Sequence, residues 1–545
     1  MNNLGTGIKL QPNIAVHHDF SGLGQLAIFP LDVLRLILLK AGGRTVRILS
    51  SGLKRLFDEA STTLTLFGSE SHNISGDESV RLISNVIRSR RALISFEVWN
   101  RQVSVVLNTV PLLAATHKGL RRFTLHCTNL GPSDMASMAP SLMAWTELRT
   151  LILNDNILDS RGAEALTPAL LSLTRLEALD LCGNTIASAG AASLAPALAD
   201  ITGLLLLDLS LNNIGAVGMQ SLAPALEKLT GLTKLNLFRN GLCSDGAASL
   251  TSCLMDLTGL CFLNLGENFF YAAGTVSLAP SLMRLINLTK LDFQGNDMGQ
   301  DGAKSFASSL MALTRLQNLT ISGNDIGPAG AAFLAPSLKM LKALHTLVIS
   351  NNNMGPDGAT SLAPSLSALR SLHSLDISSN DIGPAGAASL AASLRVLERL
   401  YSLDISKNDI GPAGAAALAP LSILTGLNEL RLSHNNLGPA GAAAFAPALM
   451  MMSGLLNLSL SCNNMGSAGA ASLAPSLAVL TGLRCLNLSQ NNLGADGTAS
   501  LTPSLMALTK LDRLHLRCNN LGSYSAALLI SNLTALNQLQ ILDID

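Results

Sequence analysis

Apolar residues recur along most of this chain in a pattern whose spacing changes from two to three or four within each short unit. In the unit from Leu176 to Gly203, Leu179 and Leu181 alternate with polar positions, as in a strand with one buried face. The segment that follows, Gly190-Ala191-Ala192 with Leu194, carries apolar residues at helical spacing. Each unit therefore predicts one short strand followed by one helix.

The units share one polar position, an asparagine that follows the strand pattern. Successive asparagines are 28 residues apart, except for one step of 27 residues from Asn408 to Asn435. A side-chain amide at a bend can satisfy backbone groups that no helix or sheet reaches, so this column predicts an internal hydrogen-bond ladder. A fixed period of this length indicates a solenoid, whose function lies on its surface and not in a buried pocket. The repeating positions are Asn156, Asn184, Asn212, Asn240, Asn268, Asn296, Asn324, Asn352, Asn380, Asn408, Asn435, Asn463, Asn491 and Asn519.

Proline recurs at one place in most of the predicted helices. Proline lacks a backbone N–H and clashes with the preceding helical turn, so we expect short or kinked helices. Strands on the inside and helices on the outside would make the stack of units curve. The recurring prolines are Pro168, Pro196, Pro224, Pro280, Pro336, Pro364, Pro475 and Pro503.

The complete phrase, Leu-x-x-Leu-x-Leu-x-x-Asn-x-[Leu/Ile]-Gly-x-x-Gly-Ala-x-x-Leu-Ala-Pro-x-Leu, resembles the ribonuclease-inhibitor-like class of leucine-rich repeats. The resemblance covers residues 120–545 as regular units. It implies an α/β leucine-rich repeat solenoid, a horseshoe with a parallel concave sheet and convex helices, in a family that binds proteins. Thr128 takes the asparagine position in the first of these units. The segments Leu64-Thr65-Leu66 and Phe96-Glu97-Val98 have the pattern of worn strands, so residues 61–119 are expected to form degenerate repeats.

Composition restricts the partners of the chain. Its formal net charge is zero and only 13% of its residues are charged, so it lacks the basic field that nucleic-acid binding needs. The most apolar stretch outside the repeat, residues 103–116, contains Asn108 and Pro111 and is too short to span a bilayer. Residues 1–20 lack the basic start and apolar core of a secretory signal. We therefore expect neither nucleic acid nor membrane as a partner.

The eight cysteines show no CxxC pair. Without a secretory signal they are interpreted as reduced thiols of a cytoplasmic protein. His434 and Cys462, and more distantly Cys518, share one column of the solenoid. Only two ligands would be adjacent there, whereas zinc takes three or four, so no metal site is predicted.

Sequence patterns of catalysis are absent. The chain has no Gly-x-x-x-x-Gly-Lys-[Ser/Thr] nucleotide loop, no His-Glu-x-x-His and no Gly-x-Ser-x-Gly elbow. His345, His373 and Tyr401 share a column and are interpreted as a polar ladder. The sequence therefore predicts a monomeric binding protein without a cofactor, and not an enzyme.

The N-terminal part of the chain breaks the repeat. Residues 1–25 are expected to be a flexible tail. Residues 26–60 contain a proline at a helix start, an acid just inside it, and apolar residues at helical spacing. This opening resembles the F-box phrase Leu-Pro-x-[Asp/Glu]-[Val/Ile]-[Leu/Val]-x-x-Ile, although Leu53-Lys54-Arg55-Leu56-Phe57 stands where that family has a Trp. The alternative is a helical cap over the open apolar end of the solenoid. The F-box resemblance implies docking to the linker subunit of a cullin–RING ubiquitin ligase through Phe29, Pro30, Leu31, Val33, Leu34 and Ile37.

The repeat departs from itself in the two units around Asn240 and Asn268. Most positions after the strand are small and polar, whereas these units hold large side chains, and Tyr271 replaces the usual Gly. Phe270 is excluded because it fills the Leu/Ile core position. The alternative is that Phe262 or Phe269 fills a local packing gap. Exposed clusters of aromatic and Arg residues are typical of binding hot spots, so a protein target is predicted to bind on the concave face at Phe238, Arg239, Phe262, Glu267, Phe269 and Tyr271.

A weaker second candidate surface is the group Arg513, His515 and Arg517, on one predicted strand near the C-terminal end of the sequence.

For function, the F-box resemblance implies a substrate-recruiting adaptor of a cullin–RING ligase, which acts by raising the local concentration of its target and performs no bond chemistry. The competing hypothesis is a free-standing scaffold or inhibitor without a ubiquitin step. A GTPase-activating horseshoe protein is a more distant alternative.

Overall fold

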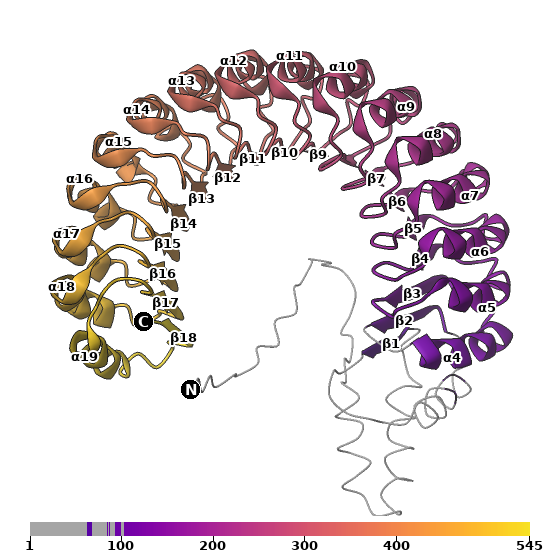
Figure 1. The fold of residues 1–545 in the computed structure, drawn as a ribbon, viewed down its shortest axis with the longest axis horizontal. Coiled ribbons are helices and arrows are strands. Elements are labelled where there is room, and N and C mark those ends of the chain that lie inside the picture. The colour runs from indigo at the N-terminus through magenta and orange to yellow at the C-terminus, as the bar shows by residue number, and fades with distance from the viewer. Residues whose placement is uncertain (1–62, 68–83, 85–86, 88–92, 100–102, 545) are drawn as a thin grey trace, which may run out of the picture.

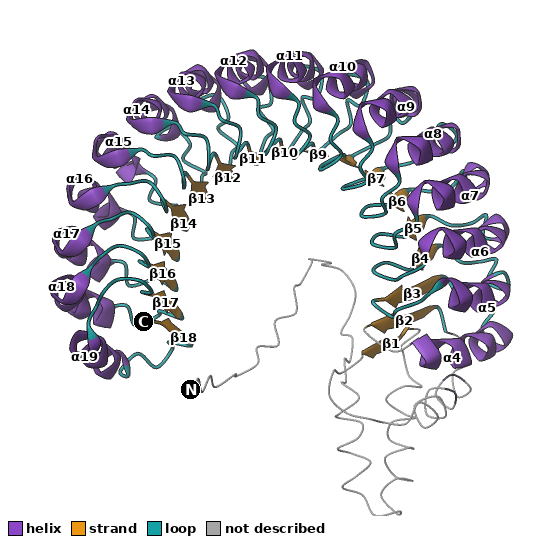
Figure 2. Cartoon of the chain, viewed as in Figure 1, coloured by secondary structure: helices purple, strands orange, loops and turns teal. Residues whose placement is uncertain are grey.

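The chain forms an open horseshoe with strands on its inner side and helices on its outer side (Figure 1). This computed structural model describes residues 63–67, 84, 87, 93–99 and 103–544. Loops connect each inner strand to an outer helix and each helix to the next strand (Figure 2). The solenoid that the repeat period predicts is therefore confirmed, including the concave position of its sheet.

All strands of the described residues belong to one parallel sheet, in which each strand pairs with the next one along the sequence. From β4 to β17 the central residue of each three-residue strand is a buried leucine, because the helices cover that face of the sheet. The strands expected around Leu64 and Phe96 are present as the first two of the sheet. The strands are β1 Thr63–Phe67, β2 Ser95–Trp99, β3 Arg122–His126, β4 Thr150–Ile152, β5 Ala178–Asp180, β6 Leu206–Asp208, β7 Lys234–Asn236, β8 Phe262–Asn264, β9 Lys290–Asp292, β10 Asn318–Thr320, β11 Thr346–Val348, β12 Ser374–Asp376, β13 Ser402–Asp404, β14 Glu429–Arg431, β15 Asn457–Ser459, β16 Cys485–Asn487, β17 Arg513–His515 and β18 Ile541–Asp543.

The helices pack side by side along the convex face. Most have a buried stripe that contains Gly, Ala and Leu, and the small residues bring neighbouring helices close together: a Cβ added at Gly330 would lie 3.1 Å from the Cβ of Ala303 in the preceding helix. The helices are α4 Val103–Thr116, α5 Pro132–Leu142, α6 Asp159–Ser172, α7 Ala187–Asp200, α8 Gly215–Leu226, α9 Cys243–Asp256, α10 Tyr271–Leu282, α11 Gly299–Leu310, α12 Gly327–Leu338, α13 Gly355–Leu366, α14 Gly383–Leu394, α15 Gly411–Leu418, the 3₁₀ helix η1 Ala419–Ile423, α16 Gly438–Met451, α17 Gly466–Val479, α18 Gly494–Ala507 and α19 Ser523–Leu533.

The asparagine column forms the predicted ladder inside the solenoid. In the unit of Asn212, the side-chain Nδ2 donates to the carbonyl oxygen of Leu209 at 3.0 Å and to that of Leu181 in the preceding unit at 2.8 Å. The backbone N–H of Asn212 donates to Oδ1 of Asn240 in the next unit at 3.1 Å. The ladder repeats from Asn184 onward: each side-chain amide links its own unit to the preceding one, and the backbone N–H links it to the next.

The first positions of the ladder differ from the regular pattern. Thr128, as predicted, takes the asparagine position and donates through its backbone N–H and its hydroxyl to Oδ1 of Asn156, at 3.0 and 2.9 Å. The next rung is broken, because Oδ1 of Asn184 is buried without a hydrogen-bond partner. A buried acceptor without a partner is destabilising, so the ladder is weakest at this unit.

The ladder also satisfies backbone groups at the start of helices in the regular units, which have no partner inside the helix. At the start of α8, the N–H of Ile214 donates to Oδ1 of Asn240 at 3.3 Å, and the N–H of Gly215 donates to the carbonyl oxygen of Asn240 at 2.9 Å. The start of α8 is therefore capped by the next unit. In α6, by contrast, the first residue Asp159 accepts from the backbone N–H groups of Arg161 and Gly162 at 2.7 and 3.3 Å.

The helices are short, as predicted, but most continue through their proline. In α12, Pro336 lies two residues before the helix ends at Leu338. Proline ends the α-helix in one case: α15 stops at Leu418 and Pro420 lies in the 3₁₀ helix η1. A 3₁₀ helix rises about 2.0 Å per residue against about 1.5 Å in an α-helix. The longer rise explains how this unit spans the same height with 27 residues instead of 28.

A second polar ladder, which the sequence analysis did not predict, links the helices near their C-terminal ends. The hydroxyl groups of five buried serines donate to a carbonyl oxygen 30 residues earlier, in the preceding helix, at 2.6 to 2.9 Å. These bonds satisfy hydroxyls that would otherwise be buried without a partner. The serines are Ser309, Ser337, Ser365, Ser476 and Ser504.

Candidate protein-binding site

Six residues form the candidate site predicted from the sequence, and the structure places them on two neighbouring units between β7 and α10. We call them the aromatic cluster: Phe238 and Arg239 after β7, Phe262 on β8, Glu267 and Phe269 after β8, and Tyr271 at the start of α10. Because the strands are parallel, the turns that follow them lie at one edge of the sheet. The cluster thus joins the concave face to that edge.

Phe262 faces the concave side of the sheet. Its neighbour Leu263 is buried under the helices, and alternate residues of a strand point to opposite faces. The register places Lys234 of β7 and Lys290 of β9 on either side of Phe262. The ammonium group of Lys290 lies 5.2 Å from the centre of the Phe262 ring, within the range of a cation–π interaction. Phe262 is therefore a half-buried aromatic group flanked by two exposed cations.

Phe238 also faces the concave side, where it lies against the backbone of the next unit. A Cβ built on Gly266 would lie 3.0 Å from Cγ of Gln294 and 3.1 Å from Cδ2 of Phe238, so a serine, which most units have at this position, would crowd both side chains. The small size of Gly266 therefore leaves room for the Phe238 ring. In the sequence, this is indicated by a glycine at the position where most units have a serine. Phe238 remains half-buried, with one part of the ring open to solvent.

Arg239 and Glu267 pair across the two units. Nε of Arg239 lies 3.4 Å from Oε2 of Glu267, and both side chains are largely exposed. An exposed ion pair of this kind contributes at most about 1 kcal/mol to stability. Its effect at the site is to leave little net charge beside Phe238, so the aromatic groups dominate this part of the surface.

The turn after β8 holds three large residues in the left-handed backbone region. Glu267, Phe269 and Tyr271 have φ angles of 53°, 57° and 54°. Gly, Asn and Asp hold most of the positions equivalent to Phe269 and Tyr271 in other units, because a bulky side chain is disfavoured there, whereas larger residues are common at the position of Glu267. Phe269 and Tyr271 are nonetheless 47% and 49% exposed, so burial does not offset the strain. Unfavourable backbone geometry of this kind is a reason to look for a function at the site.

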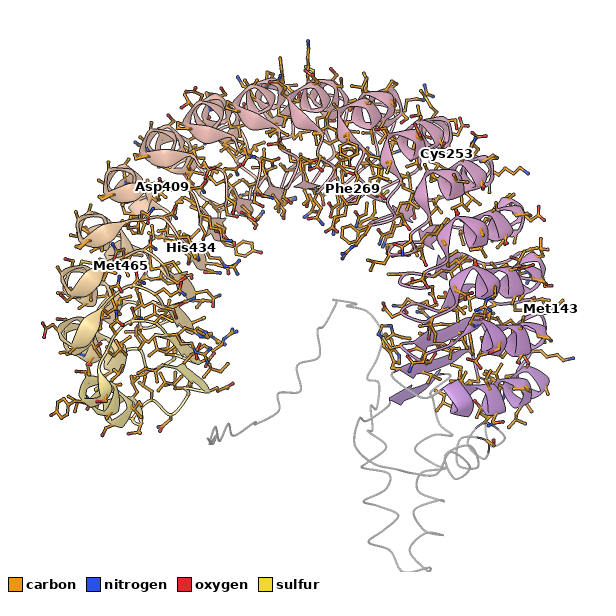
Figure 3. The ribbon with its side chains drawn as sticks, viewed as in Figure 1. Met143, Cys253, Phe269, Asp409, His434 and Met465 are labelled. Atoms are coloured by element: carbon orange, nitrogen blue, oxygen red, sulfur yellow. The ribbon has the colours of Figure 1, made fainter. Side chains whose placement is uncertain are left out.

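Figure 3 labels Phe269 toward the strand-lined inner side of the arc. Because Phe269 is 47% exposed, it does not fill a packing gap. The excluded residue Phe270, by contrast, is fully buried, and its ring lies 5.6 Å from that of Phe293 in the core. The separation of Phe269 from Phe270 that the sequence analysis made is therefore confirmed.

Two residues of the weaker candidate group, His515 and Arg517, contact one carboxylate within the solenoid. His515 Nδ1 lies 3.3 Å from Oδ2 of Asp543 on β18, and Arg517 forms an ion pair with the same carboxylate. The column of His345, His373 and Tyr401 is also stacked as predicted, with the two imidazole rings 5.0 Å apart. These contacts explain His515, Arg517 and the stacked column without a bound partner.

Three half-buried acids lie at the ends of β5, β9 and β13. Burial raises the pKa of Asp180 to about 6, although its carboxylate accepts a hydrogen bond from the backbone N–H of Cys182. Burial also raises the pKa of Asp292 and that of Asp404, and each carboxylate accepts a hydrogen bond from a backbone N–H two residues later. These carboxylates therefore hold turns together at the end of their strands.

The cysteines of the chain are free thiols. Burial raises the pKa of Cys182 and of Cys253 to about 12, so neither is a reactive thiolate at neutral pH. Among the described residues, one group of three side chains has metal-ligating atoms within 4.8 Å of one another: His126, Cys127 and Asp155. That group lies about four units from the aromatic cluster, between β3 and α6.

The residues predicted to dock a ligase linker subunit lie outside the described residues. These are Phe29, Pro30, Leu31, Val33, Leu34 and Ile37, and they remain a prediction from the sequence. In the described part of the chain, every helix is too short or too polar to cross a membrane.

Comparison with known proteins agrees with the repeat architecture. A profile of the leucine-rich repeat family matches nine segments of the chain, residues 204–223, 284–307, 313–335, 342–363, 368–391, 400–419, 425–446, 455–474 and 480–501. No curated protein matches the chain. The nine matched segments are leucine-rich repeats, and they lie within the strand–helix solenoid described above.

Several solved structures are similar to this chain at low sequence identity. A leucine-rich repeat protein of Leptospira interrogans is 19% identical over 74% of this chain and 91% of its own, with a TM-score of 0.50. An internalin of Listeria monocytogenes is 20% identical over 75% of this chain and 88% of its own, with a TM-score of 0.41. The matched chain of a TLR13–ssRNA13 complex is 17% identical over 90% of this chain and 78% of its own, with a TM-score of 0.41.

Proposed function

We propose that this protein is a substrate-recruiting adaptor, which holds a protein target at the aromatic cluster and delivers it to a cullin–RING ubiquitin ligase. The leucine-rich repeats make it a protein-binding scaffold. The observation that carries the proposed target site is the exposure of Phe269 and Tyr271 at strained backbone positions, next to Phe238 and Phe262 on the concave face. The chain performs no bond chemistry in this role.

The chemistry of the cluster defines what the target should present. Large half-exposed rings favour an apolar side chain that can be removed from water, and such contacts carry most of the affinity at hot spots. The ammonium groups of Lys234 and Lys290 on either side of Phe262 favour carboxylates around that apolar group. We therefore expect a target segment with an aromatic or aliphatic anchor flanked by acidic residues.

The ligase half of the proposal rests on the F-box resemblance of residues 26–60. Replacing Phe29, Pro30 and Leu34 together with alanine should abolish co-purification with the linker subunit of a cullin–RING ligase. The same variant should still bind its target, because the repeats are unchanged. If the linker subunit still co-purifies, residues 26–60 are a solenoid cap, and the protein is the alternative that the sequence leaves open, a free-standing scaffold or inhibitor.

The N-terminal boundaries belong to the same proposal. Residues 1–25 act as a tail, residues 26–60 as the docking segment, residues 61–119 as degenerate repeats, and residues 120–545 as regular repeats of the ribonuclease-inhibitor-like class. We further propose that the protein acts as a cytoplasmic monomer. Sedimentation of the purified chain at micromolar concentration tests the monomer, and a dimer would contradict it.

A further inference from the structure

His126, Cys127 and Asp155 come together at the end of β3 and in the turn after β4. His126 is the last residue of β3, and Cys127 follows it with a φ of 50°. Asp155 holds the position equivalent to Cys127 one unit later and has a φ of 55°. The backbone N–H of Cys127 donates to the carbonyl oxygen of Asn154 at 3.3 Å, which ties the two turns together.

The donor atoms of these side chains converge. Nδ1 of His126 lies 3.4 Å from Oδ2 of Asp155, and Nε2 of His126 lies 3.3 Å from Sγ of Cys127. One donor atom from each of the three residues lies within 4.8 Å of the other two. Ligands at about 2.0 to 2.3 Å from a tetrahedral zinc ion are about 3.3 to 3.6 Å apart, so small side-chain rotations suffice to place all three around one ion.

The imidazole of His126 also has a ring nitrogen that makes no hydrogen bond. Its Nδ1 atom is buried and makes no hydrogen bond, because the contact with Asp155 lacks the geometry of one. The ring of Trp99 lies 4.7 Å from the imidazole and restricts its movement. A buried ring nitrogen without a partner is unfavourable, and a metal ion beside it would remove that cost.

We propose that His126, Cys127 and Asp155 bind a divalent transition-metal ion of the zinc class. The donor set of one imidazole, one thiolate and one carboxylate is one that zinc accepts. Three protein ligands leave a fourth position, which a water molecule or a side chain of a bound protein fills. Binding would connect the turns of two neighbouring units at the start of the regular repeats.

A nucleophilic thiol is the other chemistry that a Cys, a His and an Asp can support. In that case the thiol would need to lose its proton easily. Burial and the nearby Asp155 carboxylate instead raise the pKa of Cys127. A bound cation displaces the thiol proton directly, so the same raised pKa is compatible with a metal site and opposes an activated nucleophile.

Cobalt(II) is the probe that tests the site, because a tetrahedral cobalt–thiolate centre absorbs visible and near-ultraviolet light. The reduced full-length protein, freed of metal with a chelator, should bind one cobalt ion with thiolate-to-cobalt absorption. Zinc should then displace the cobalt and raise the melting temperature. His126→Gln, Cys127→Ser and Asp155→Asn should each weaken binding at least about tenfold, and Asn is well tolerated at a positive φ.

A matched control comes from the same repeat positions elsewhere. His434 and Cys462 occupy the places equivalent to Cys127 in their own units, and within the described residues they belong to no group of three ligands. The variant with His434→Gln and Cys462→Ser should bind cobalt like the wild type. The proposal is overturned if the wild type gives no tetrahedral cobalt spectrum, or if only Cys127→Ser, and neither of the other two variants, alters it.

Discussion

Replacing Asn324 with alanine tests the hydrogen-bond ladder at a regular part of the solenoid. The side chain is fully buried. Its Nδ2 atom donates to the carbonyl oxygens of Phe293, Ile321 and Ser322 at 2.8, 3.1 and 3.2 Å. Its Oδ1 atom accepts from the backbone N–H of Asn296 at 3.2 Å. Alanine removes all four hydrogen bonds at once.

The four lost hydrogen bonds do not cost the same free energy. The Phe293 carbonyl keeps the amide of Asn296 at 3.1 Å, and the Ile321 carbonyl keeps the amide of Asn352 at 2.9 Å. The Ser322 carbonyl keeps a backbone N–H of the preceding unit at 2.8 Å. Only the N–H of Asn296 loses its acceptor. One unpaired buried donor costs about 1–3 kcal/mol, so we expect a local destabilisation of about 2 kcal/mol.

Hydrogen exchange measured by mass spectrometry is the suitable assay, because a repeat protein can open in parts and its melting curve averages over them. A peptide containing Asn296 should exchange about 30-fold faster in the variant, which corresponds to about 2 kcal/mol. Asn318→Ala is the control, since this half-exposed asparagine of β10 has no place in the ladder. Unchanged exchange at Asn296 in the Asn324 variant would refute the role assigned to the ladder.

Three further changes test other parts of the account. Tyr271→Gly should raise the free energy of unfolding by about 1 kcal/mol in urea titration, because glycine relieves the backbone strain at a φ of 54°; a lower value would contradict that strain. Ser337→Ala should lower it by about 1 kcal/mol, through loss of the 2.7 Å bond to the Ala307 carbonyl, and an unchanged midpoint would argue against the serine ladder. Burial raises the pKa of Asp180 from 3.8 to about 6, so the folded state favours its neutral form and this residue reduces stability as pH rises through that window. Asp180→Asn should therefore raise the melting temperature near pH 7 and change it little near pH 4, whereas an equal gain at both values would exclude this cause.

The repeat pattern was sufficient to predict the curved solenoid, because each unit buries its apolar face only against its neighbours. Asn184 to Asn519 lie in the ladder that their spacing predicts. The helices passing through proline were harder to foresee, since Pro336 lies in the last turn of α12, where loss of one hydrogen bond is tolerated. The serine ladder was missed because Ser337 has the same appearance in sequence as an exposed serine.

The candidate site was predictable only in part. Phe269 and Tyr271 stood out because they replace small residues, and the structure adds that both occupy left-handed backbone positions. The accommodation of Phe238 by Gly266 depends on contact between two units and needed coordinates. The group of His126, Cys127 and Asp155 also depends on contact between two units, since Cys127 and Asp155 share one column of the repeat and His126 belongs to the neighbouring column.

Target affinity of a variant with Phe238→Ala and Tyr271→Ala tests the central claim most directly. Loss of a true hot spot costs about 2 kcal/mol or more, so we predict target binding weaker by well over tenfold, with little change in melting temperature and with the ligase linker subunit still bound. Tyr401→Ala is the control, because this tyrosine is also 47% exposed but lies outside the aromatic cluster, and it should bind the target like the wild type. Unchanged affinity in the double variant, or an equal loss in the Tyr401 control, would contradict the assignment of the aromatic cluster as the binding site.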